Sequence, residues 1–325
     1  MKNFLIFKTD RLGDLINISP IISNIKLHYP SSEITLICSK YNYSLAKYYE
    51  KDLNLIIYNK PLIFFLVKNF QKLFNKKYDT ILQLDGKNHS YLISLFIRSK
   101  NKLCVKYIKI KKIFGIFFKI NRPNFFINLF FNYNVVSFED YNHLDNKKFH
   151  YLKLYLKLLE KINIKIFSKN HNLPFKNPSN ITKFNKDYIL LHLDTRWNEF
   201  SNNVISSLIK KINHISKDNN LVISSNVGGN DIFENVKYEF SNNNNIEIID
   251  GPNLNNTLNL IYFSSTCISS HSGLIVHSAA AFNKKIIDIV SPKIFNELDR
   301  WIPFNVNYKR FDINNFINSD FDLRS

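Results

Sequence analysis

The sequence predicts an α/β protein with two domains, each built around a doubly wound parallel sheet. Short apolar runs of strand length alternate with longer segments in which apolar residues recur at helical spacing. Strands separated by helices are typical of such parallel sheets. The 325 residues suit two domains of about 150 residues each, and a second alternating series begins at Asp187.

The first half begins with the apolar run Phe4–Phe7, which is long enough for a buried strand and too short for a helix. A polar turn, Lys8–Asp14, follows, and a helix is expected after it from the spacing of Leu15, Ile18, Ile22 and Ile25. Further on we expect strands at Glu33–Cys38, Leu53–Tyr58 and Tyr78–Leu84, and helices at Pro61–Phe74, Ser90–Ile97 and Tyr151–Leu159.

The segment Lys106–Val136 interleaves lysines and arginines with many phenylalanines and isoleucines. Such a basic-aromatic segment can lie in a membrane interface, with its rings buried and its cations on anionic headgroups. Alternatively, it is a strand and a helix of the first domain that supply ordinary core phenylalanines. The interruption at Arg122-Pro123-Asn124 argues against one long amphipathic helix and favours the second interpretation.

The stretch Phe167–Lys186 is rich in Asn, Ser and Pro and is predicted to connect the two domains. The second half then repeats the alternation, and the small-residue helix His277–Ala281 follows the turn His271-Ser272-Gly273. We expect the strands of this half at Asp187–Asp194, Leu221–Ser225, Ile246–Ile249, Thr266–Ser270 and Lys285–Val290.

Composition and cysteine usage restrict the class of protein. Hydrophobic residues make up 45% of the chain, which provides for two cores and disfavours intrinsic disorder. Cys38, Cys104 and Cys267 are widely spaced without a CxxC pair, so zinc and disulfide scaffolds are disfavoured and a reducing cytoplasm fits. Phe4–Phe7 is too short for a signal peptide, and no apolar run approaches the roughly 18 residues of a membrane span. We therefore expect a soluble or peripheral protein.

The net charge is +18, from 44 Lys and Arg against 26 Asp and Glu. One interpretation is an anionic partner, such as nucleic acid, a membrane surface or a phosphorylated glycan. The other is compositional drift, because Lys, Asn, Ile, Phe and Tyr abound while Gly, Pro and Ala are sparse, as in an AT-rich genome. Cations that cluster weigh more toward function than the total does.

The most informative stretch is Phe4–Pro30, where an expected strand leads through a charged loop into a helix. The loop, Lys8–Asp14, holds two carboxylates, two cations and a glycine. Ligands of open α/β sheets gather at the carboxyl ends of strands, where this loop is expected to lie. Alternatively, Asp10 or Asp14 serves only to cap the following helix by accepting backbone N–H bonds.

This strand and the loop that ends in Leu12-Gly13-Asp14 resemble the N-terminal motif of glycosyltransferase family 9, the heptosyltransferase-like enzymes. In that family the Asp acts as catalytic base, and the matching residue is Asp14. A carboxylate there can take the proton of an acceptor hydroxyl as it attacks an anomeric carbon. The resemblance thus favours catalysis over capping, and Lys8 and Arg11 are expected to bind acceptor phosphates or to lower the pKa of the carboxylate.

The turn His271-Ser272-Gly273 and the helix that follows form a second match. In the family, an Asp-Ser/Thr-Gly turn precedes a histidine and an alanine-rich helix, and forms part of the nucleotide-sugar site. The resemblance implies that His271, Ser272, Gly273 and His277 bind the donor, with helix N–H groups on its diphosphate. The sequence departs from the family's pattern at two positions, which bear on the identity of the donor sugar and its base. His271 stands where the family usually has Asp, and His277 lies one residue further from Gly273 than in the common pattern. The alternative is a helix whose alanines merely admit a tightly packed neighbour.

The loop His192–Glu199, directly after the first strand of the second half, is a third match. In the family, hydroxyl and basic residues of this loop contact the donor phosphates. Thr195 and Arg196 are the corresponding candidates, and Arg196 offers a bidentate contact. The alternatives are a surface salt bridge for Arg196 and a core anchor for Trp197.

Three further motifs carry weaker signals. Val227–Asn230 lacks the GxGxxG spacing of a dinucleotide loop and is expected to be a turn. Asp320-Phe321-Asp322 has the DxD form of metal-dependent glycosyltransferases, but it lies in the tail and is interpreted as accidental. Asp85 follows a predicted strand together with Lys87 and His89. We assign Asp85 to the acceptor side, with a solvated loop as the alternative.

The resemblance implies the GT-B architecture, in which two Rossmann-like domains face a cleft. The expected parts are an acceptor-binding domain at 1–168, a linker at 169–186, a nucleotide-sugar-binding domain at 187–300, and a C-terminal segment at 301–325 that crosses back onto the first domain. The implied activity is inverting, metal-independent transfer of heptose or a similar sugar from a nucleotide-diphosphate sugar, such as ADP-heptose, to lipopolysaccharide or another cell-surface glycan. No cofactor and no metal are expected. The expected location is the cytoplasm or, peripherally, the inner face of the cytoplasmic membrane.

Two other classes of function remain open. A basic RNA-binding protein would fit the charge and the many aromatic residues, although no RNP, KH or helix-turn-helix signature is present. A catalytically inactive family member that only binds glycan would fit His271 in place of the usual Asp.

Overall fold

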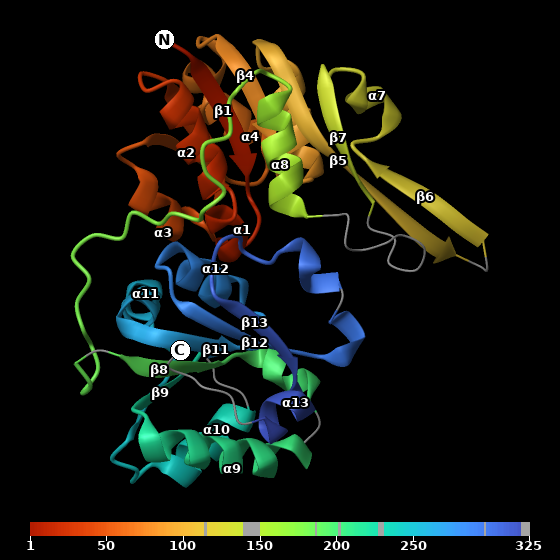
Figure 1. Cartoon of the computed structure of the whole chain (residues 1–325). Coiled ribbons are helices and arrows are strands. Elements are labelled where there is room, and N and C mark those ends of the chain that lie inside the picture. The colour runs from red at the N-terminus through yellow and green to blue at the C-terminus, as the bar shows by residue number, and fades with distance from the viewer. Residues whose placement is uncertain are drawn as a thin grey trace. The chain divides into compact units, whose positions relative to one another are not determined.

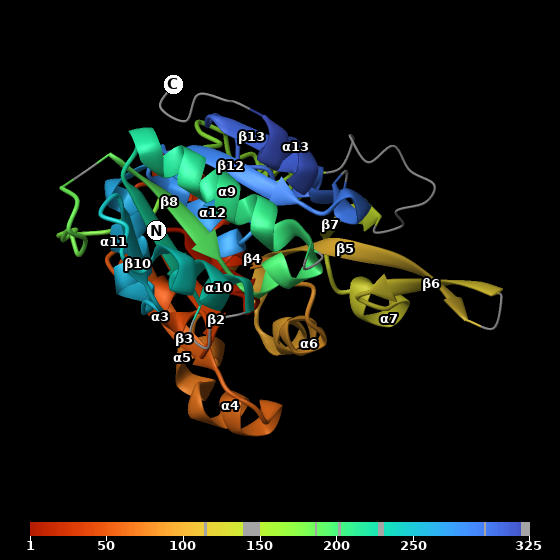
Figure 2. The same ribbon diagram turned by 90° about the horizontal axis from the view of Figure 1, so that it is seen from below.

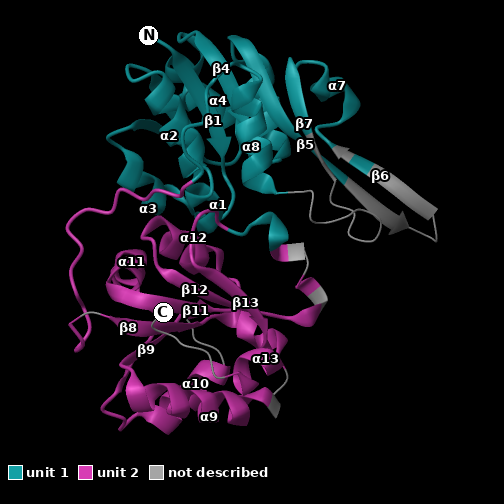
Figure 3. Ribbon diagram, viewed as in Figure 1, with its two compact units in different colours: residues 1–169, 299–302 teal, residues 170–298, 303–325 magenta. Residues whose placement is uncertain are grey.

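The computed structural model describes residues 1–113, 116–138, 150–185, 187–200, 203–226, 231–295 and 297–319. The chain divides into two compact units (Figure 3): unit 1 comprises residues 1–169 and 299–302, and unit 2 comprises residues 170–298 and 303–325. Each unit is a mainly parallel sheet flanked by helices (Figure 1). The predicted fold class is therefore confirmed. The motifs at Val227–Asn230 and Asp320-Phe321-Asp322 lie outside the described residues.

Unit 1 contains a seven-stranded sheet with the order β3-β2-β1-β4-β5-β6, in which β7 also pairs with β5. Its pairings are parallel except that of β5 with β6. The elements are β1 (Asn3–Lys8), α1 (Leu12–Ile16), α2 (Ser19–His28), β2 (Glu33–Ser39), α3 (Tyr43–Ala46), β3 (Leu53–Tyr58), α4 (Leu62–Lys68), α5 (Phe70–Phe74), β4 (Tyr78–Gln83), α6 (Asn88–Phe96), β5 (Ser99–Ile113), β6 (Ile116–Arg122), α7 (Phe125–Asn128), β7 (Tyr133–Phe138) and α8 (Tyr151–Glu160).

Unit 2 contains a six-stranded sheet, all parallel, with the order β10-β9-β8-β11-β12-β13. Its elements are β8 (Tyr188–Leu193), α9 (Asn203–Asp218), β9 (Leu221–Ser225), α10 (Asp231–Phe240), β10 (Ile246–Ile249), α11 (Leu254–Phe263), β11 (Ser264–Ser269), α12 (Gly273–Ala281), β12 (Lys285–Val290), β13 (Tyr308–Asp312) and α13 (Ile313–Asn318). Before β13, residues 299–302 belong to unit 1, where the ring of Trp301 stacks on that of Tyr151 with centroids 4.9 Å apart.

The region after β1 differs from the sequence-based prediction. Helix α1 begins at Leu12, so Asp14 lies in its first turn rather than in a loop. A second helix, α2, starts at Ser19, because Pro20 has no N–H with which to continue the hydrogen bonds of α1. In this described part of the chain, the N-cap of α1 is Arg11, and no side chain caps the helix through a hydrogen bond. The predicted alternative of capping by Asp10 or Asp14 is therefore wrong.

The basic-aromatic segment Lys106–Val136 forms the end of β5, then β6, α7 and the start of β7. The interpretation as strand and helix is confirmed, and a single long amphipathic helix is not present. The expectation of ordinary core phenylalanines holds for Phe131, which is buried, but not for Phe125 and Phe126, which are exposed. Among the described residues, none of the helices has the length and hydropathy needed to cross a bilayer.

We expect Gly86, which follows β4, to tolerate no side chain. Its φ is +62°, and an added Cβ would lie 2.6 Å from Cε2 of the buried Tyr107 ring. Gly86→Ala should therefore lower the free energy of unfolding by about 1–3 kcal/mol in chemical denaturation. The control is Lys87→Ala at the exposed next residue, which should change the free energy by less than about 0.5 kcal/mol. Equal stability of the Gly86 variant and the unchanged protein would contradict this geometry.

Candidate functional site

In each unit the strand order reverses beside the central strand, between β1 and β4 in unit 1 and between β8 and β11 in unit 2. At such points the connections that leave the carboxyl ends of the strands diverge and open a crevice for ligands. The residues singled out from the sequence follow these four strands: Asp14 after β1, Asp85 after β4, Arg196 after β8 and His271 after β11. Asp14 and Asp85 therefore lie where the strand order of unit 1 reverses, and Arg196 and His271 lie where that of unit 2 reverses. We call these two places the switch points.

Lys8, the last residue of β1, is buried, with 1% of its surface exposed. Its Nζ donates to Asp10 Oδ2 at 3.1 Å, to the carbonyl oxygen of Leu84 at 3.2 Å and to the hydroxyl of Tyr155 at 3.2 Å. Burial alone would lower the pKa of the amine, but the carboxylates of Asp10 and Asp14 outweigh it and raise the pKa. Since its donors are used inside unit 1, Lys8 holds the segment after β1 in place. Its role as a ligand of acceptor phosphates stays a prediction.

Asp10 is the ion-pair partner of Lys8. Burial raises the pKa of Asp10 to about 7, against the opposing effect of Lys8 and with support from the carboxylates of Asp85 and Asp14. The carboxylates of Asp10 and Asp14 therefore both act on the buried ammonium, and the one that is ion-paired with it is Asp10.

Asp85 is buried and accepts five hydrogen bonds. Its Oδ2 receives the backbone N–H of Thr9 at 3.1 Å and the hydroxyls of Thr9 and Ser90 at 2.6 and 2.7 Å. Its Oδ1 receives the side-chain amide of Gln83 at 2.6 Å and the N–H of Lys87 at 3.1 Å. Asp85 thus ties the segment after β1 to the start of α6. It is not part of a solvated loop, and its assignment to the acceptor side stays a prediction.

Asp14 differs from the other two carboxylates. It is half-buried in the first turn of α1, and among the described residues it has no hydrogen-bond or ion-pair partner. It nevertheless lies within electrostatic reach of the ammonium of Lys8 and the hydroxyl of Tyr155. Arg11, the N-cap residue, is exposed beside it. An accessible carboxylate on a rigidly held segment is what proton abstraction from a ligand requires.

The donor candidates of unit 2 gather at the start of α12. This helix has nine residues, and its N-cap, Ser272, makes no side-chain hydrogen bond to it within the described residues. The first-turn N–H groups have no acceptor within the helix, so they are available to an anion. Gly273 begins the helix with no side chain to obstruct such a ligand.

His271 holds the turn before α12 through a partner that the sequence analysis missed. Its φ is +46°, a conformation that residues with side chains rarely adopt. Asp288 of β12, fully buried, accepts its backbone N–H at 2.6 Å and its Nδ1–H at 2.7 Å. Tyr308 of β13 donates its hydroxyl to the same carboxylate at 2.6 Å. The one available signal was Asp288 between the apolar residues of KIIDIV, since a buried acid requires a hydrogen-bond partner.

His277 lies one turn further along α12 and is buried, with its ring stacked on that of His171 at a centroid distance of 5.1 Å. Ala279 and Ala280 of the same helix pack in the core of unit 2, together with Tyr188 of β8. The helix is therefore closely packed along its length, as the alternative interpretation expected, and the part of it that can meet an anion is the set of backbone N–H groups in its first turn.

Arg196 and Thr195 lie in a 3₁₀ turn directly after β8. Two hydrogen bonds fix the turn. Asp194 accepts the N–H of Arg196 at 3.0 Å, and the fully buried Trp197 donates its indole N–H to the carbonyl of His192 at 2.9 Å. Trp197 is thus the core anchor that the alternative interpretation expected. The guanidinium of Arg196 is half-buried and has no ion pair with another described residue, so the predicted salt bridge is absent there. Thr195 is exposed.

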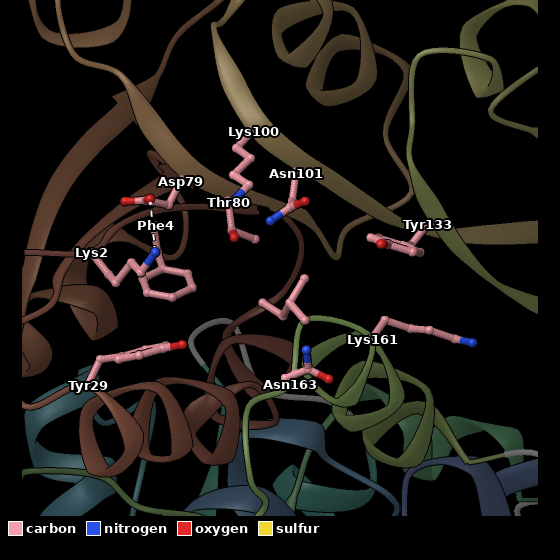
Figure 4. Close-up of a pocket in the computed structure, with 11 residues that line it drawn as sticks. Lys2, Phe4, Tyr29, Asp79, Thr80, Lys100, Asn101, Tyr133, Lys161 and Asn163 are labelled. Atoms are coloured by element: carbon pink, nitrogen blue, oxygen red, sulfur yellow. Dashed lines mark hydrogen bonds and ion pairs between the residues drawn. The ribbon is translucent and has the colours of Figure 1, made fainter.

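Two further observations concern ligands. Among the described residues, no group of three or more His, Cys, Asp and Glu side chains is arranged to hold a metal ion. A cavity of about 270 Å³ opens at the amino edge of the unit 1 sheet, where Phe4, Thr80 and Asn101 lie near the starts of β1, β4 and β5 (Figure 4). Ligands of this fold class bind at the carboxyl edge instead, and the cavity contains none of the residues singled out from the sequence.

No family model and no curated sequence matches the chain. Its structure is similar to that of the glycosyl transferase family 9 protein from Veillonella parvula, with a TM-score of 0.68 and 13% identity over 96% of this chain and 87% of that one. The E. coli heptosyltransferase WaaC with ADP-2-deoxy-2-fluoro heptose gives a TM-score of 0.67 and 14% identity over 95% and 92%. The chain has the GT-B fold. A UDP-GlcNAc 2-epimerase from Methanocaldococcus jannaschii is also similar, at a TM-score of 0.51 and 14% identity over 98% and 90%, so the fold alone does not decide the reaction.

We expect His192 to make unit 2 sensitive to acid. Its ring is buried and bonded to Ser224 and Asn226, and burial lowers its pKa below the ordinary 6.5. Above that pH both folded and unfolded chains hold a neutral ring. Below it only the unfolded chain takes up the proton, so stability falls. Between pH 6.5 and 5, His192→Gln should therefore lose less unfolding free energy than the unchanged protein, by up to about 1.4 kcal/mol per pH unit.

Urea denaturation across this pH range measures the effect, with His214→Gln at an exposed position of α9 as the control. Parallel pH curves for the His192 variant and the unchanged protein would show that the buried ring is not the group responsible.

Proposed function

We propose that this chain is an inverting, metal-independent glycosyltransferase that moves heptose or a similar sugar from a nucleotide-diphosphate sugar to a lipopolysaccharide or other cell-surface glycan. The observation that carries the proposal is Asp14, a half-buried carboxylate without a described partner beside a switch point. The Leu12-Gly13-Asp14 resemblance and the GT-B fold support it.

Asp14 is the proposed base. The acceptor hydroxyl loses its proton to this carboxylate as its oxygen attacks the anomeric carbon in a single displacement, which inverts that carbon. Lys8 and Asp85 act as positioning residues, because their hydrogen bonds hold the segment between β1 and α1. Arg11, exposed beside the base, is the proposed contact for acceptor phosphates.

The leaving group is a nucleoside diphosphate, which departs with added negative charge. The first turn of α12 supplies N–H donors to the diphosphate, and Arg196 supplies a charged, planar donor pair. Thr195, His271 and Ser272 complete the proposed donor site, in which Nε2 of His271 is the ring nitrogen not bonded to Asp288. His277 lies beyond the first turn of α12 and supports the helix by stacking its ring on that of His171. Since these groups meet the charge of the diphosphate, the proposed mechanism requires no metal ion.

The donor and acceptor classes are proposed on the neighbours named above. The E. coli heptosyltransferase was determined with a fluorinated ADP-heptose, so ADP-heptose is the first donor to test. We infer that the acceptor is a glycan or a lipid-linked glycan and that the enzyme meets it at the inner face of the cytoplasmic membrane.

Asp14→Asn removes the base while keeping the shape of the side chain. Turnover of ADP-heptose with a lipopolysaccharide-core acceptor should fall by about 10²- to 10⁴-fold, while the rise in melting temperature that donor causes should stay the same. Asp52→Asn, at an exposed position between α3 and β3, is the control and should keep full turnover. Retained turnover in the Asp14 variant would exclude this base. If the unchanged protein has no turnover and the substitution leaves its glycan binding unaffected, the chain is a glycan-binding scaffold.

Arg196→Ala should weaken donor binding, because a hydrogen bond from a charged group contributes about 1.5–3 kcal/mol, or roughly 10- to 100-fold in affinity. Thermal-shift titration with ADP-, GDP-, UDP- and CMP-sugars measures it, since a ligand that binds only the folded state raises the melting temperature. Lys210→Ala on α9 is the matched cationic control. A flat response of the unchanged protein to every sugar nucleotide would count against the enzyme.

A further inference from the structure

Helix α4 exposes apolar side chains that a water-soluble surface normally hides. It is apolar around its circumference: Phe65 is buried in the core, whereas Ile63, Phe64 and Val67 are 71–73% exposed. Phe70 at the start of α5 is also exposed. A helix that is apolar on every side is normally covered on every side, so the outer side of α4 indicates a missing partner.

Helix α7 repeats this pattern. Phe125 and Phe126, with Leu129 and Phe130 in the turn that follows, are 59–74% exposed. They stand at positions i, i+1, i+4 and i+5, which share one side of a helical segment. On the other side, Ile127 packs against the core. The exposed rings are therefore gathered on one side of the segment rather than scattered around it.

These helices lie on one face of the unit 1 sheet, together with α6 (Figure 2). Phe65 of α4 and Ile93 of α6 share one core cluster, and Ile127 of α7 packs with Tyr91 of α6 in another. The end of α6 adds the exposed Phe96. We call the exposed apolar side chains of this group the apolar face: Ile63, Phe64, Val67, Phe70, Phe96, Phe125, Phe126, Leu129 and Phe130. Single exposed apolar residues are normal, but a group on one face marks an interaction surface.

Positive charge collects in the same part of the chain. Residues Leu53–Phe138 hold fifteen Lys and Arg against two acids, Asp79 and Asp85, so about a quarter of the chain carries thirteen of its eighteen net positive charges. Compositional drift would spread the positive charge evenly along the chain, whereas here it is concentrated in this segment. Exposed cations flank α4 and α7, namely Lys60, Lys68, Lys72 and Arg122.

We propose that the apolar face docks on an anionic lipid bilayer. Phenylalanine and aliphatic side chains enter the boundary between headgroups and acyl chains, while flanking lysines and arginines meet the anionic headgroups. RNA fits less well, because Ile63, Val67 and Leu129 have no ring on which a base can stack. A second copy of the chain fits less well too, because like charges would be brought together. The purpose of docking rests on the proposed function, since a lipid-linked acceptor is met at a membrane.

Vesicle co-sedimentation of the full chain tests the proposal without any substrate. The chain should bind vesicles of phosphatidylcholine mixed with phosphatidylglycerol, bind pure phosphatidylcholine only weakly, and lose binding as salt is raised. The double variants Phe64→Ser with Val67→Ser, and Phe126→Ser with Phe130→Ser, should each weaken binding by about tenfold or more. Lys68→Glu with Lys72→Glu should remove the preference for anionic vesicles.

Leu27→Ser is the matched control, because Leu27 is an exposed apolar residue of α2 in the same unit but outside the apolar face. It should leave vesicle binding unchanged, and melting temperatures check that every variant folds. Absence of binding to anionic vesicles, or equal binding by all variants, would overturn the proposal. So would a dimer, or RNA binding, that the phenylalanine variants abolish.

A second readout separates this proposal from the proposed function. The face variants should keep full turnover on a delipidated, water-soluble acceptor, because none of the changed residues belongs to the proposed catalytic or donor site. Vesicle binding without any sugar transfer would uphold docking and reject the enzyme. Transfer without vesicle binding would uphold the enzyme and reject docking.

Discussion

The ammonium of Lys8 organises the carboxyl edge of unit 1. It lies buried at the end of the central strand and bonds to the segment after β1, to the end of β4 and to helix α8. A buried charge without partners would be costly, so these contacts have to form together. Asp85 completes the arrangement by binding Thr9 and Ser90 across the switch point. As a result, α1 begins at a defined place, and its first turn presents Asp14.

Unit 2 uses a related device. Asp288 is buried in β12 and binds the backbone of His271, which follows the neighbouring strand β11, as Asp85 binds the backbone of Thr9. In each unit a carboxylate on a strand or just after it thus holds the backbone that leaves the neighbouring strand, at the edge where ligands of this fold bind. A single carboxylate can accept several such N–H and O–H bonds, and it therefore fixes a connection that has no regular structure of its own.

Much of the fold could be predicted from the sequence, because its strands are short apolar runs between polar turns. The strands at Leu53–Tyr58, Leu221–Ser225 and Lys285–Val290 have the predicted bounds. The start of α1 was placed too late, because Leu12-Gly13-Asp14 has weak helical propensity and reads as a loop. The strand β13 and the helix α13 were not predicted at all, because their few apolar residues form no clear strand or helix pattern. The strand is defined by its pairing with β12.

The candidate site was less predictable than the fold. Its loops were found, because polar residues after apolar runs mark the carboxyl ends of strands. The partners that hold these loops come from distant segments: Tyr155 from α8, Asp288 from β12 and Tyr308 from β13. Nothing local distinguishes Tyr155 from other tyrosines on an amphipathic helix. The exposure of Phe125 and Phe126 was hidden for the same reason, since a phenylalanine in a sequence reads as core.

The pairing of His271 with Asp288 has a consequence for how this site can change over generations. An Asp in place of His271 alone would set a second carboxylate against that of the fully buried Asp288. Like charges at that distance cannot both stay ionised without strain on the turn. The two positions therefore form a matched pair, and a carboxylate at the first requires a residue other than a carboxylate at the second.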